Sequence, residues 1–230
     1  MTDIHSHILP FVDDGSDSYE KSFEMLKRAA EYGITNVVLT PHFKRGVYGN
    51  NTEKVKQEFE KFQIAVKEQN IPVKVYLGQE ILCDSKIYED LKNGNLLTFN
   101  DSKYVFLDFD YFEYSDIADF AYNIKAMGYI PVIAHIERYK YLSANTLISL
   151  KNDGALIQVN AASVTGKYGR AFKKKVFAAI KSGLVDFVAT DTHYGRQESL
   201  EQAYKIVAKR FGKETAEKLF LKNAEKFNII

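Results

Sequence analysis

Short runs of β-branched and aromatic residues alternate with longer amphipathic stretches along the chain, and this alternation is the feature that most restricts the fold. Runs of this kind predict seven strands, at Thr2–His5, Thr35–Thr40, Val73–Gln79, Tyr104–Phe109, Ile130–Ala134, Leu156–Asn160 and Asp186–Thr190. Helical spacing of apolar residues covers 18–33, 52–69, 115–128, 171–183, 199–212 and a last stretch at 215–227. The order predicts βα units around a largely parallel sheet, either closed as a barrel or open and doubly wound.

Chain length and charge balance narrow the class of protein further. The chain has 230 residues, of which 46% are hydrophobic, and no linker or repeat interrupts it, so we expect residues 1–230 to form a single domain. The formal net charge is +1, which gives no overall field towards nucleic acid. We expect Lys173–Lys175 to be a solvated helix face. The sequence leaves the oligomeric state open.

Cellular location is predicted from the same composition. No apolar run approaches the roughly 18 residues of a membrane span, and the first residues lack a signal-peptide pattern, so no membrane insertion is expected. Cys83 is the only cysteine, which excludes an internal disulfide and suits a reducing compartment. These observations predict a cytoplasmic protein.

All five histidines stand at or just past the carboxyl end of a predicted strand. They are His5, His7, His42, His135 and His193. In barrels and in open α/β sheets alike, this end of the sheet is where the βα loops gather and active sites form. One histidine at a strand end is more often a hydrogen-bonded structural residue, but random placement would put several of the five on helices. The set therefore indicates a common site.

Acidic residues occupy matching positions beside the histidines. Candidate ligands are Asp14, Glu80, Asp108 and Asp191. In an extended backbone, residues two apart point to the same face, so His5 with His7, and Asp191 with His193, can reach one ion. Imidazole mixed with carboxylate suits Mn²⁺, Fe²⁺ or Zn²⁺. Nine candidate ligands are too many for one ion and indicate two or three.

The motifs that these residues form resemble those of a known superfamily. D-x-H-x-H from Asp3, TPH at His42, GQE at Glu80, HIER from His135 and TDTH at Asp191 resemble the polymerase and histidinol phosphatase (PHP) superfamily. More narrowly, HSHILP, TPHF, GQEI and GYIPVIAH resemble manganese-dependent tyrosine phosphatases of bacterial capsule and exopolysaccharide operons. The resemblance runs over almost the whole chain. It implies a distorted seven-stranded (β/α) barrel that holds three metal ions.

The resemblance also implies a set of ligands for each ion. His5, His7, Glu80 and Asp191 would hold the first; Glu80, Asp108 and His135 the second; and Asp14, His42 and His193 the third. The family usually has glutamate where this chain has Asp108, so the second site could shift, weaken or use Asp110, although Asp108 is preferred. Spacing alone does not separate Asp13 from Asp14. The resemblance favours Asp14, and Asp13 would then be a turn residue.

This arrangement predicts phosphate hydrolysis without a nucleophilic side chain. A hydroxide that bridges two ions would attack phosphorus, because metal ions lower the pKa of water from ~15.7 towards ~7. Arg138 and Arg196 follow ligand-bearing strands, where a guanidinium could hold phosphate oxygens. A tyrosine leaving group has a pKa of ~10 and needs little protonation.

The expected protein is thus a metal-dependent protein-tyrosine phosphatase. The resemblance implies manganese, with iron or zinc as alternatives, and a phosphotyrosine-containing partner such as a bacterial tyrosine kinase that controls capsular or exopolysaccharide synthesis. Two alternatives stay open: a small-molecule phosphatase of the histidinol phosphate type, and a module that binds phosphotyrosine without turnover.

Overall fold

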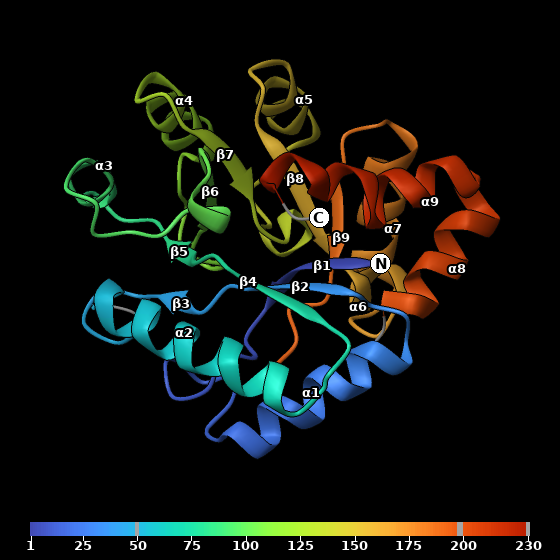
Figure 1. Cartoon of the computed structure of the whole chain (residues 1–230). Coiled ribbons are helices and arrows are strands. Elements are labelled where there is room, and N and C mark those ends of the chain that lie inside the picture. The colour runs from blue at the N-terminus through green and yellow to red at the C-terminus, as the bar shows by residue number, and fades with distance from the viewer. Residues whose placement is uncertain (49–50, 197–199, 229–230) are drawn as a thin grey trace.

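The predicted strands are all present in the computed structural model, which describes residues 1–48, 51–196 and 200–228. Figure 1 shows them with helices packed around them. The strands are β1 (Thr2–Ser6), β2 (Asn36–Leu39), β3 (His42–Phe43), β4 (Lys74–Leu77), β5 (Glu80–Leu82), β6 (Tyr104–Asp108), β7 (Ile130–Ile133), β8 (Leu156–Asn160) and β9 (Phe187–Ala189).

Two predicted strands are interrupted, and each continues as a second short strand. The run Thr35–Thr40 ends at Leu39 and resumes as β3 after Pro41, which has no N–H to donate to a ladder. The run Val73–Gln79 stops before Gly78, and β5 begins at Glu80. The two interruptions lie side by side, because His42 pairs with Glu80 in the next ladder. They place two predicted ligands opposite each other.

All strand pairs are parallel, as expected from βα units, but they form two sheets. One has the order β1-β2-β4 and the other β3-β5-β6-β7-β8-β9. A bridge between Ser6 and Thr192 connects the two, and the Asp191 N–H donates to the His5 carbonyl over 2.9 Å. The fold is therefore an α/β fold with a curled parallel sheet, and the expected ring of seven strands is divided where the two interruptions fall.

Nine helices are described, six of them in or near the predicted segments. They are α1 (Tyr19–Glu31), α2 (Thr52–Glu68), α3 (Ile87–Lys92), α4 (Ile117–Ala126), α5 (Ala144–Asn152), α6 (Ala161–Thr165), α7 (Arg170–Lys181), α8 (Leu200–Phe211) and α9 (Lys213–Phe220). The sequence did not predict α3 and α6, which are too short to show a clear apolar period, or α5, which buries only Leu147 and Leu150. The predicted helix 199–212 starts at Ser199, outside the described residues. The last predicted stretch divides into α9 and a 3₁₀ helix at Lys222–Phe227.

A small apolar cluster fills the inside of the curled sheet beneath the strand ends. Phe99 and Phe227 stack with ring centroids 4.4 Å apart, and Phe106 lies against Phe99. The edge of Phe106 meets the ring of His5, with centroids 4.7 Å apart. The larger cluster lies between the strands and the surrounding helices. The inner cluster thus gives the candidate ligands a dry, rigid floor. None of the described helices is long and apolar enough to cross a membrane.

Candidate metal centre

The structure brings the predicted ligands together at the carboxyl ends of the strands. Eight of the nine belong to tight groups, and the ninth, Asp14, has its Oδ1 3.7 Å from His42 Nε2 and His193 Nε2. Among the described residues, four overlapping groups have ligand atoms within 4.8 Å of one another: His5 with His7 and Glu80; His5 with His135 and Asp191; Glu80 with Asp108 and His135; and His7 with His42 and His193. Their ligand role stays a prediction, but their convergence is a property of the fold.

Glu80 lies at the middle of these groups. Its Oε1 is 2.8 Å from His135 Nε2 and 3.3 Å from His5 Nε2. Its Oε2 is 2.8 Å from His42 Nδ1 and 3.2 Å from His7 Nε2. One buried carboxylate therefore contacts four imidazoles, two from the end of β1 and one each from β3 and the end of β7. This is the geometry that a bridging ligand needs.

The first predicted ligand set is compact. His5 Nε2 and His7 Nε2 are 3.2 Å apart, so the alternation of β1 points both rings the same way. Asp191 Oδ1 lies 3.7 Å from His5 Nε2 and 3.6 Å from His7 Nε2. With Glu80, four ligand atoms surround one small volume.

The second set contains Asp108 and excludes Asp110. Asp108 Oδ1 is 3.7 Å from His135 Nε2, and Asp108 is buried at the last position of β6. Asp110 is exposed, and its carboxylate accepts the N–H groups of Phe112 and Glu113. The shorter side chain at 108 is therefore accommodated in the cluster, and Asp110 holds a turn outside it.

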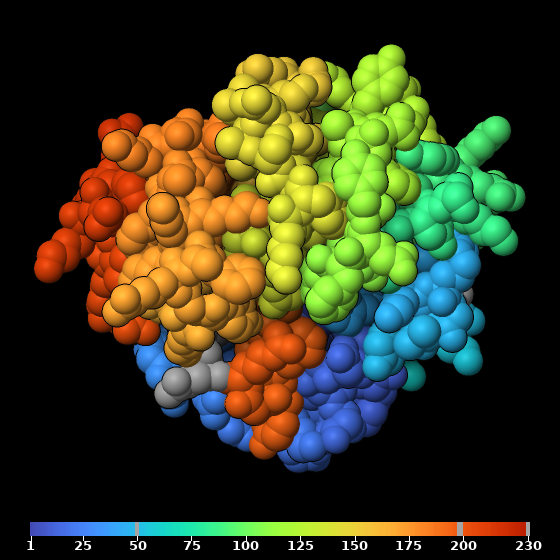
Figure 2. Space-filling model, turned by 180° about the vertical axis from the view of Figure 1, so that it is seen from behind, coloured from blue at the N-terminus to red at the C-terminus, as the bar shows by residue number. Residues whose placement is uncertain are grey.

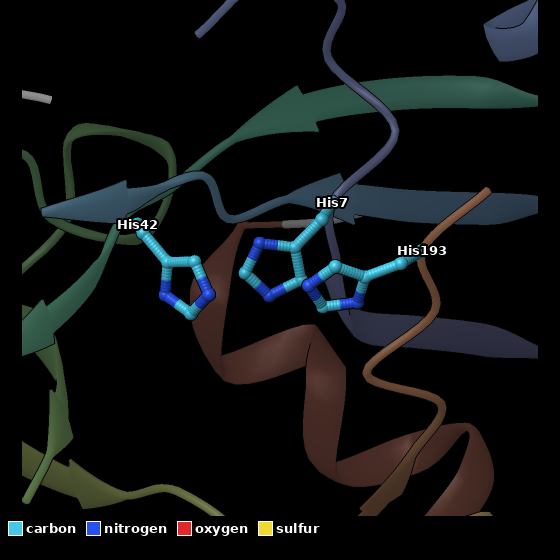
Figure 3. A group of neighbouring side chains, drawn as sticks. All are labelled: His7, His42 and His193. Atoms are coloured by element: carbon cyan, nitrogen blue, oxygen red, sulfur yellow. The ribbon is translucent and has the colours of Figure 1, made fainter. Parts of the chain in front are cut away.

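The third set is the most open to solvent. His7, His42 and His193 point towards one another from three separate segments (Figure 3). Asp14 Oδ1 is 3.7 Å from both His42 Nε2 and His193 Nε2. Side chains of Asp14 and His42 are 53% and 25% exposed, whereas those of His5 and Glu80 are fully buried or nearly so. A ligand from solvent would reach this side of the centre first.

Asp13 orients His7, a role that the sequence did not predict. Its Oδ2 is 2.7 Å from His7 Nδ1 and accepts the His42 N–H, while its Oδ1 accepts the Gly15 N–H. A turn residue was anticipated at this position, but the buried contact with His7 was not. Burial would raise the pKa of Asp13, yet the hydrogen bond with His7 lowers it to about 2. Asp13 therefore fixes the ring and leaves Nε2 for an ion.

Two polar residues of β8 support the ligands from below, and neither was predicted. Gln158 Oε1 accepts the His135 N–H over 2.7 Å and lies 3.4 Å from His5 Nδ1. Gln158 also donates to Asn160, whose side chain donates to Asp191 Oδ2 over 2.9 Å. The only signal in the sequence is a pair of amides in the strand LIQVN, where apolar residues would otherwise fill a buried position.

Two ligand candidates have a backbone conformation that is unusual for their residue type. His135 has φ 24° and Asp191 has φ 55°, both outside the range that side chains other than glycine prefer. Such strain persists only where surrounding contacts hold it, and it is concentrated at functional sites. Here the two residues turn at the ends of β7 and β9, which directs their side chains into the cluster.

The pKa is lowered in two imidazoles of the cluster and raised in two others. Burial lowers the pKa of His135 and of His193 to about 4, so both rings are neutral near pH 7. Burial also acts against the charged forms of His7 and His42, but contacts with Asp13 and Glu80 outweigh it and raise their pKa. Burial and the neighbouring Glu80 raise the pKa of Asp108. The cluster thus holds protons that a cation would displace.

Metal binding is therefore expected to release protons and to weaken in acid. His7 and His42 must lose a proton before they bind an ion, so affinity should fall as pH decreases from 8 to 6, by roughly tenfold per pH unit for each proton displaced. Calorimetric titration with Mn²⁺ in buffers of different ionisation enthalpy measures this release. A binding enthalpy that is independent of the buffer would contradict the prediction.

The chemistry of the cluster fits divalent transition-metal ions. Glu80 Oε2 is buried without a well-oriented hydrogen bond, although two imidazole nitrogens lie near it. His5 Nε2 and His7 Nε2 face each other, and only one of them could donate to the other. Neutral imidazoles and carboxylates aimed at shared volumes are the donor set that Mn²⁺, Fe²⁺ and Zn²⁺ accept.

The two predicted arginines both approach Asp191. Arg138 donates to Asp191 Oδ2 over 2.6 Å and to the Tyr111 hydroxyl over 2.9 Å. Arg196 is 47% exposed and donates to the Asp191 carbonyl over 3.0 Å. The rings of Tyr111 and Tyr168 lie 5.4 and 5.6 Å from the Arg138 guanidinium. These contacts hold two cationic groups beside the cluster, with N–H groups left over.

Tyr139 positions two ligand candidates, and its removal gives a test. Its buried hydroxyl donates to Asp108 Oδ1 over 2.9 Å and lies 3.3 Å from His135 Nδ1. We expect Tyr139→Phe to fold but to bind its most weakly held ion about 10 to 100 times less tightly. Metal content after dialysis at graded free Mn²⁺ measures this. Tyr141→Phe, which loses a bond to the Asp110 carbonyl, is the control; an equal loss in both variants would contradict the role of Tyr139.

A parallel α/β fold with imidazoles and carboxylates clustered at its strand ends is typical of metal-dependent hydrolases. The family model for capsular polysaccharide synthesis, CpsB/CapC, matches residues 1–228. The chain belongs to this family, as the motifs indicated.

Relatives and solved structures agree with this membership. Tyrosine-protein phosphatase YwqE of Bacillus subtilis is 34% identical over 93% of this chain and 86% of its own length. Tyrosine-protein phosphatase CpsB of Streptococcus pneumoniae is 34% identical over 98% and 97%. Crystal structures of YwqE and CpsB, described as unique metal-dependent tyrosine phosphatases, include a chain with TM-score 0.88 and 32% identity, covering 94% of this chain and 90% of that one. A histidinol phosphate phosphatase from Lactococcus lactis shares the fold at TM-score 0.60 and 16% identity.

Proposed function

We propose that this chain hydrolyses phosphotyrosine in proteins, with metal ions held by the nine clustered residues. The observation that carries the proposal is the convergence of four imidazoles on the Glu80 carboxylate, with two arginines beside the cluster. Family membership supports it, because relatives at 31–37% identity over most of the chain are named tyrosine-protein phosphatases or putative ones. The chain is accordingly a metal-dependent tyrosine-protein phosphatase.

We assign the ligands as the motifs implied. His5, His7, Glu80 and Asp191 hold one ion; Glu80, Asp108 and His135 a second; and Asp14, His42 and His193 a third. The single free nitrogen of His7 supports this division, because Nδ1 is bound to Asp13 and cannot serve another ion. Manganese is the proposed ion. When bound, such ions activate water and stabilise charge on phosphate oxygens.

The residues of the chain bind and orient the phosphate. Arg138 uses two of its five N–H groups on Asp191 and Tyr111, which leaves donors for non-bridging phosphate oxygens. Arg196 supplies a second, more exposed cation. The phenolate that leaves has a pKa of about 10, so no residue needs to act as a strong general acid.

The remaining expectations belong to the same proposal. Residues 1–230 form one phosphatase domain, and the two sheets together make the distorted seven-stranded barrel, with β2 continuing as β3 and β4 as β5. The substrate is a phosphotyrosine-containing protein, proposed to be a bacterial tyrosine kinase of polysaccharide synthesis, and the reaction takes place in the cytoplasm.

The deciding experiment compares three phosphate esters. Phosphate release is measured from a phosphotyrosyl peptide, the matching phosphoseryl peptide and histidinol phosphate, after chelation and after Mn²⁺ is restored. We expect metal-dependent turnover of the phosphotyrosyl peptide, lost in His42→Ala and His135→Ala. Turnover of histidinol phosphate alone would identify a small-molecule phosphatase, and metal binding without any turnover would identify a non-catalytic module.

A further inference from the structure

A basic groove lies on the surface between α7 and the end of α8, and none of the candidate metal ligands lines it. Its volume is about 720 Å³. Five cationic side chains line it: Arg170, Lys173, Lys174, Lys181 and Arg210. Two half-buried rings, Phe177 and Phe211, lie between them, with centroids 5.5 Å apart. The groove therefore combines positive walls with an apolar lining.

Four of the cations form one stripe along α7. Arg170, Lys173, Lys174 and Lys181 follow helical spacing, with Phe177 between them on the same face. Like charges three and four residues apart repel one another and destabilise a helix. Arg170 is also the first residue of α7, whose first turn has no acidic side chain, so it faces the positive end of the helix dipole. The stripe costs stability in the free protein.

These cations lack the acidic partners that other surface lysines have. Within residues 1–48, 51–196 and 200–228, no ion pair connects any of the five to a carboxylate, whereas Lys21 pairs with Asp17 and Lys205 with Glu201. Arg210 and Lys173 instead lie 4.8 and 5.3 Å from the ring of Phe177. In a chain whose net charge is only +1, this is a local excess of positive charge.

The groove also begins next to the candidate phosphate site. Tyr168, two residues before Arg170, has its ring 5.6 Å from the Arg138 guanidinium. Lys175, expected to be solvated with its neighbours, is instead half-buried and donates to the carbonyls of Ile136 and Tyr139. One side of α7 thus supports the segment that carries Arg138, and another side forms the groove. In Figure 2 the orange segment that includes α7 lies between the yellow segments in the middle of the view and the red carboxyl-terminal helices at its left edge.

We propose that this groove is a docking site for an acidic segment of the phosphoprotein substrate, bound while its phosphotyrosine occupies the metal centre. The inference rests on the proposed function. From Arg170 to Lys181 the stripe spans about 16 Å of helix, which matches roughly five residues of extended peptide. A flat bilayer does not enter a recess between two helices. Arg210 and Lys173 lie 4.8 and 5.3 Å from the Phe177 ring, so a nucleic-acid base would have to compete with them to stack there.

Binding without turnover gives the first test. The probe is a fluorescent, unphosphorylated peptide that carries five consecutive acidic residues, and the control peptide has glutamine in their place. Lys174→Glu/Lys181→Glu/Arg210→Glu reverses three exposed charges in the groove, and Lys27→Glu/Lys54→Glu/Lys67→Glu reverses three exposed charges on α1 and α2. We expect salt-sensitive binding of the acidic peptide, weakened about tenfold or more only in the groove variant.

Steady-state kinetics gives the second test. Two phosphotyrosyl peptides are compared, one with the acidic segment and one with glutamine. We expect the acidic segment to lower KM about tenfold in the unmodified and control proteins with kcat unchanged, and to have no effect in the groove variant. Turnover of the glutamine peptide should be equal in all three.

Several outcomes would overturn the docking site. One is an equal loss in the two triple variants, which would mean that only net charge matters. Another is no advantage of the acidic peptide. A third is groove-dependent binding of anionic vesicles or an oligonucleotide that is tighter than binding of the peptide. If no phosphotyrosyl peptide is hydrolysed at all, the proposed function fails. Binding of the unphosphorylated peptide then still tests whether the groove is a docking site for acidic segments.

Discussion

Replacing Glu80 by glutamine is expected to abolish phosphatase turnover, with kcat reduced by about a thousandfold or more. The carboxylate contacts His5, His7, His42 and His135, so its charge is shared by the whole cluster. Glutamine keeps the shape but removes the charge, and its amide N–H₂ cannot bind a cation. Burial acts against ionisation of Glu80, yet the surrounding imidazoles hold its pKa well below the usual range. Its charge is therefore present throughout the physiological pH range.

Metal content and turnover, measured on the same samples, check this result. Glu89→Gln, an exposed position on α3, is the isosteric control and should retain both. Circular dichroism confirms that the variant is folded. A Glu80→Gln protein that keeps its full metal content and its activity would show that Glu80 does not bridge ions.

Gly15→Ala is expected to lower the free energy of unfolding by about 3 kcal/mol and to remove activity as well. A Cβ atom at Gly15 would lie 2.0 Å from the His7 carbonyl oxygen and 2.3 Å from the His7 Cβ atom. Both belong to rigid parts of the chain, so the loop that carries Asp13 and Asp14 must move. That movement breaks the contact between Asp13 and His7.

Thermal unfolding and turnover measure the two effects of this change. Gly78→Ala is the matched control, because neither glycine has a positive φ and a new Cβ atom at Gly78 would lie 3.2 Å from side-chain atoms only. We expect Gly78→Ala to cost less stability and to leave the metal centre loaded, because its closest contacts are at 3.2 Å, compared with 2.0 Å at Gly15, and involve no backbone atom. If Gly15→Ala were as stable and as active as Gly78→Ala, the loop would not depend on this close approach.

The candidate ligands could be predicted from the sequence because their position depends on local rules. Strand periodicity places His5 and His7 on one face, and parallel strands bring their carboxyl ends to a common edge. The supporting residues could not be predicted in this way. Gln158 contacts His5 across 153 residues, and Tyr139 reaches Asp108 across 31. Such contacts depend on how strands are arranged in space, about which spacing along the chain says nothing.

The strands show the same contrast between positions that local sequence predicts and positions that depend on strand pairing. Alternating runs located each strand. The break at Pro41 could not be located in this way, because it depends on pairing: β2 pairs with β4, whereas β3 pairs with β5 through His42 and Glu80. The helices α3 and α6 were missed because six and five residues are too few for a clear helical period, and α5 because it buries only Leu147 and Leu150.

The contact between β1 and β9 has a consequence for the order of events during synthesis. The His5 carbonyl accepts the Asp191 N–H, and Asp3 binds Thr190 through its N–H and its hydroxyl. His5 and His7 emerge from the ribosome first, but their partners Asp191 and His193 follow more than 180 residues later. Until then the first ligand set lacks Asp191 and the third lacks His193, although the other seven candidate ligands have been synthesised by residue 135. The contact of β9 with β1 is therefore the step that completes the candidate metal centre, and it can form only after residues 187–193 have been synthesised.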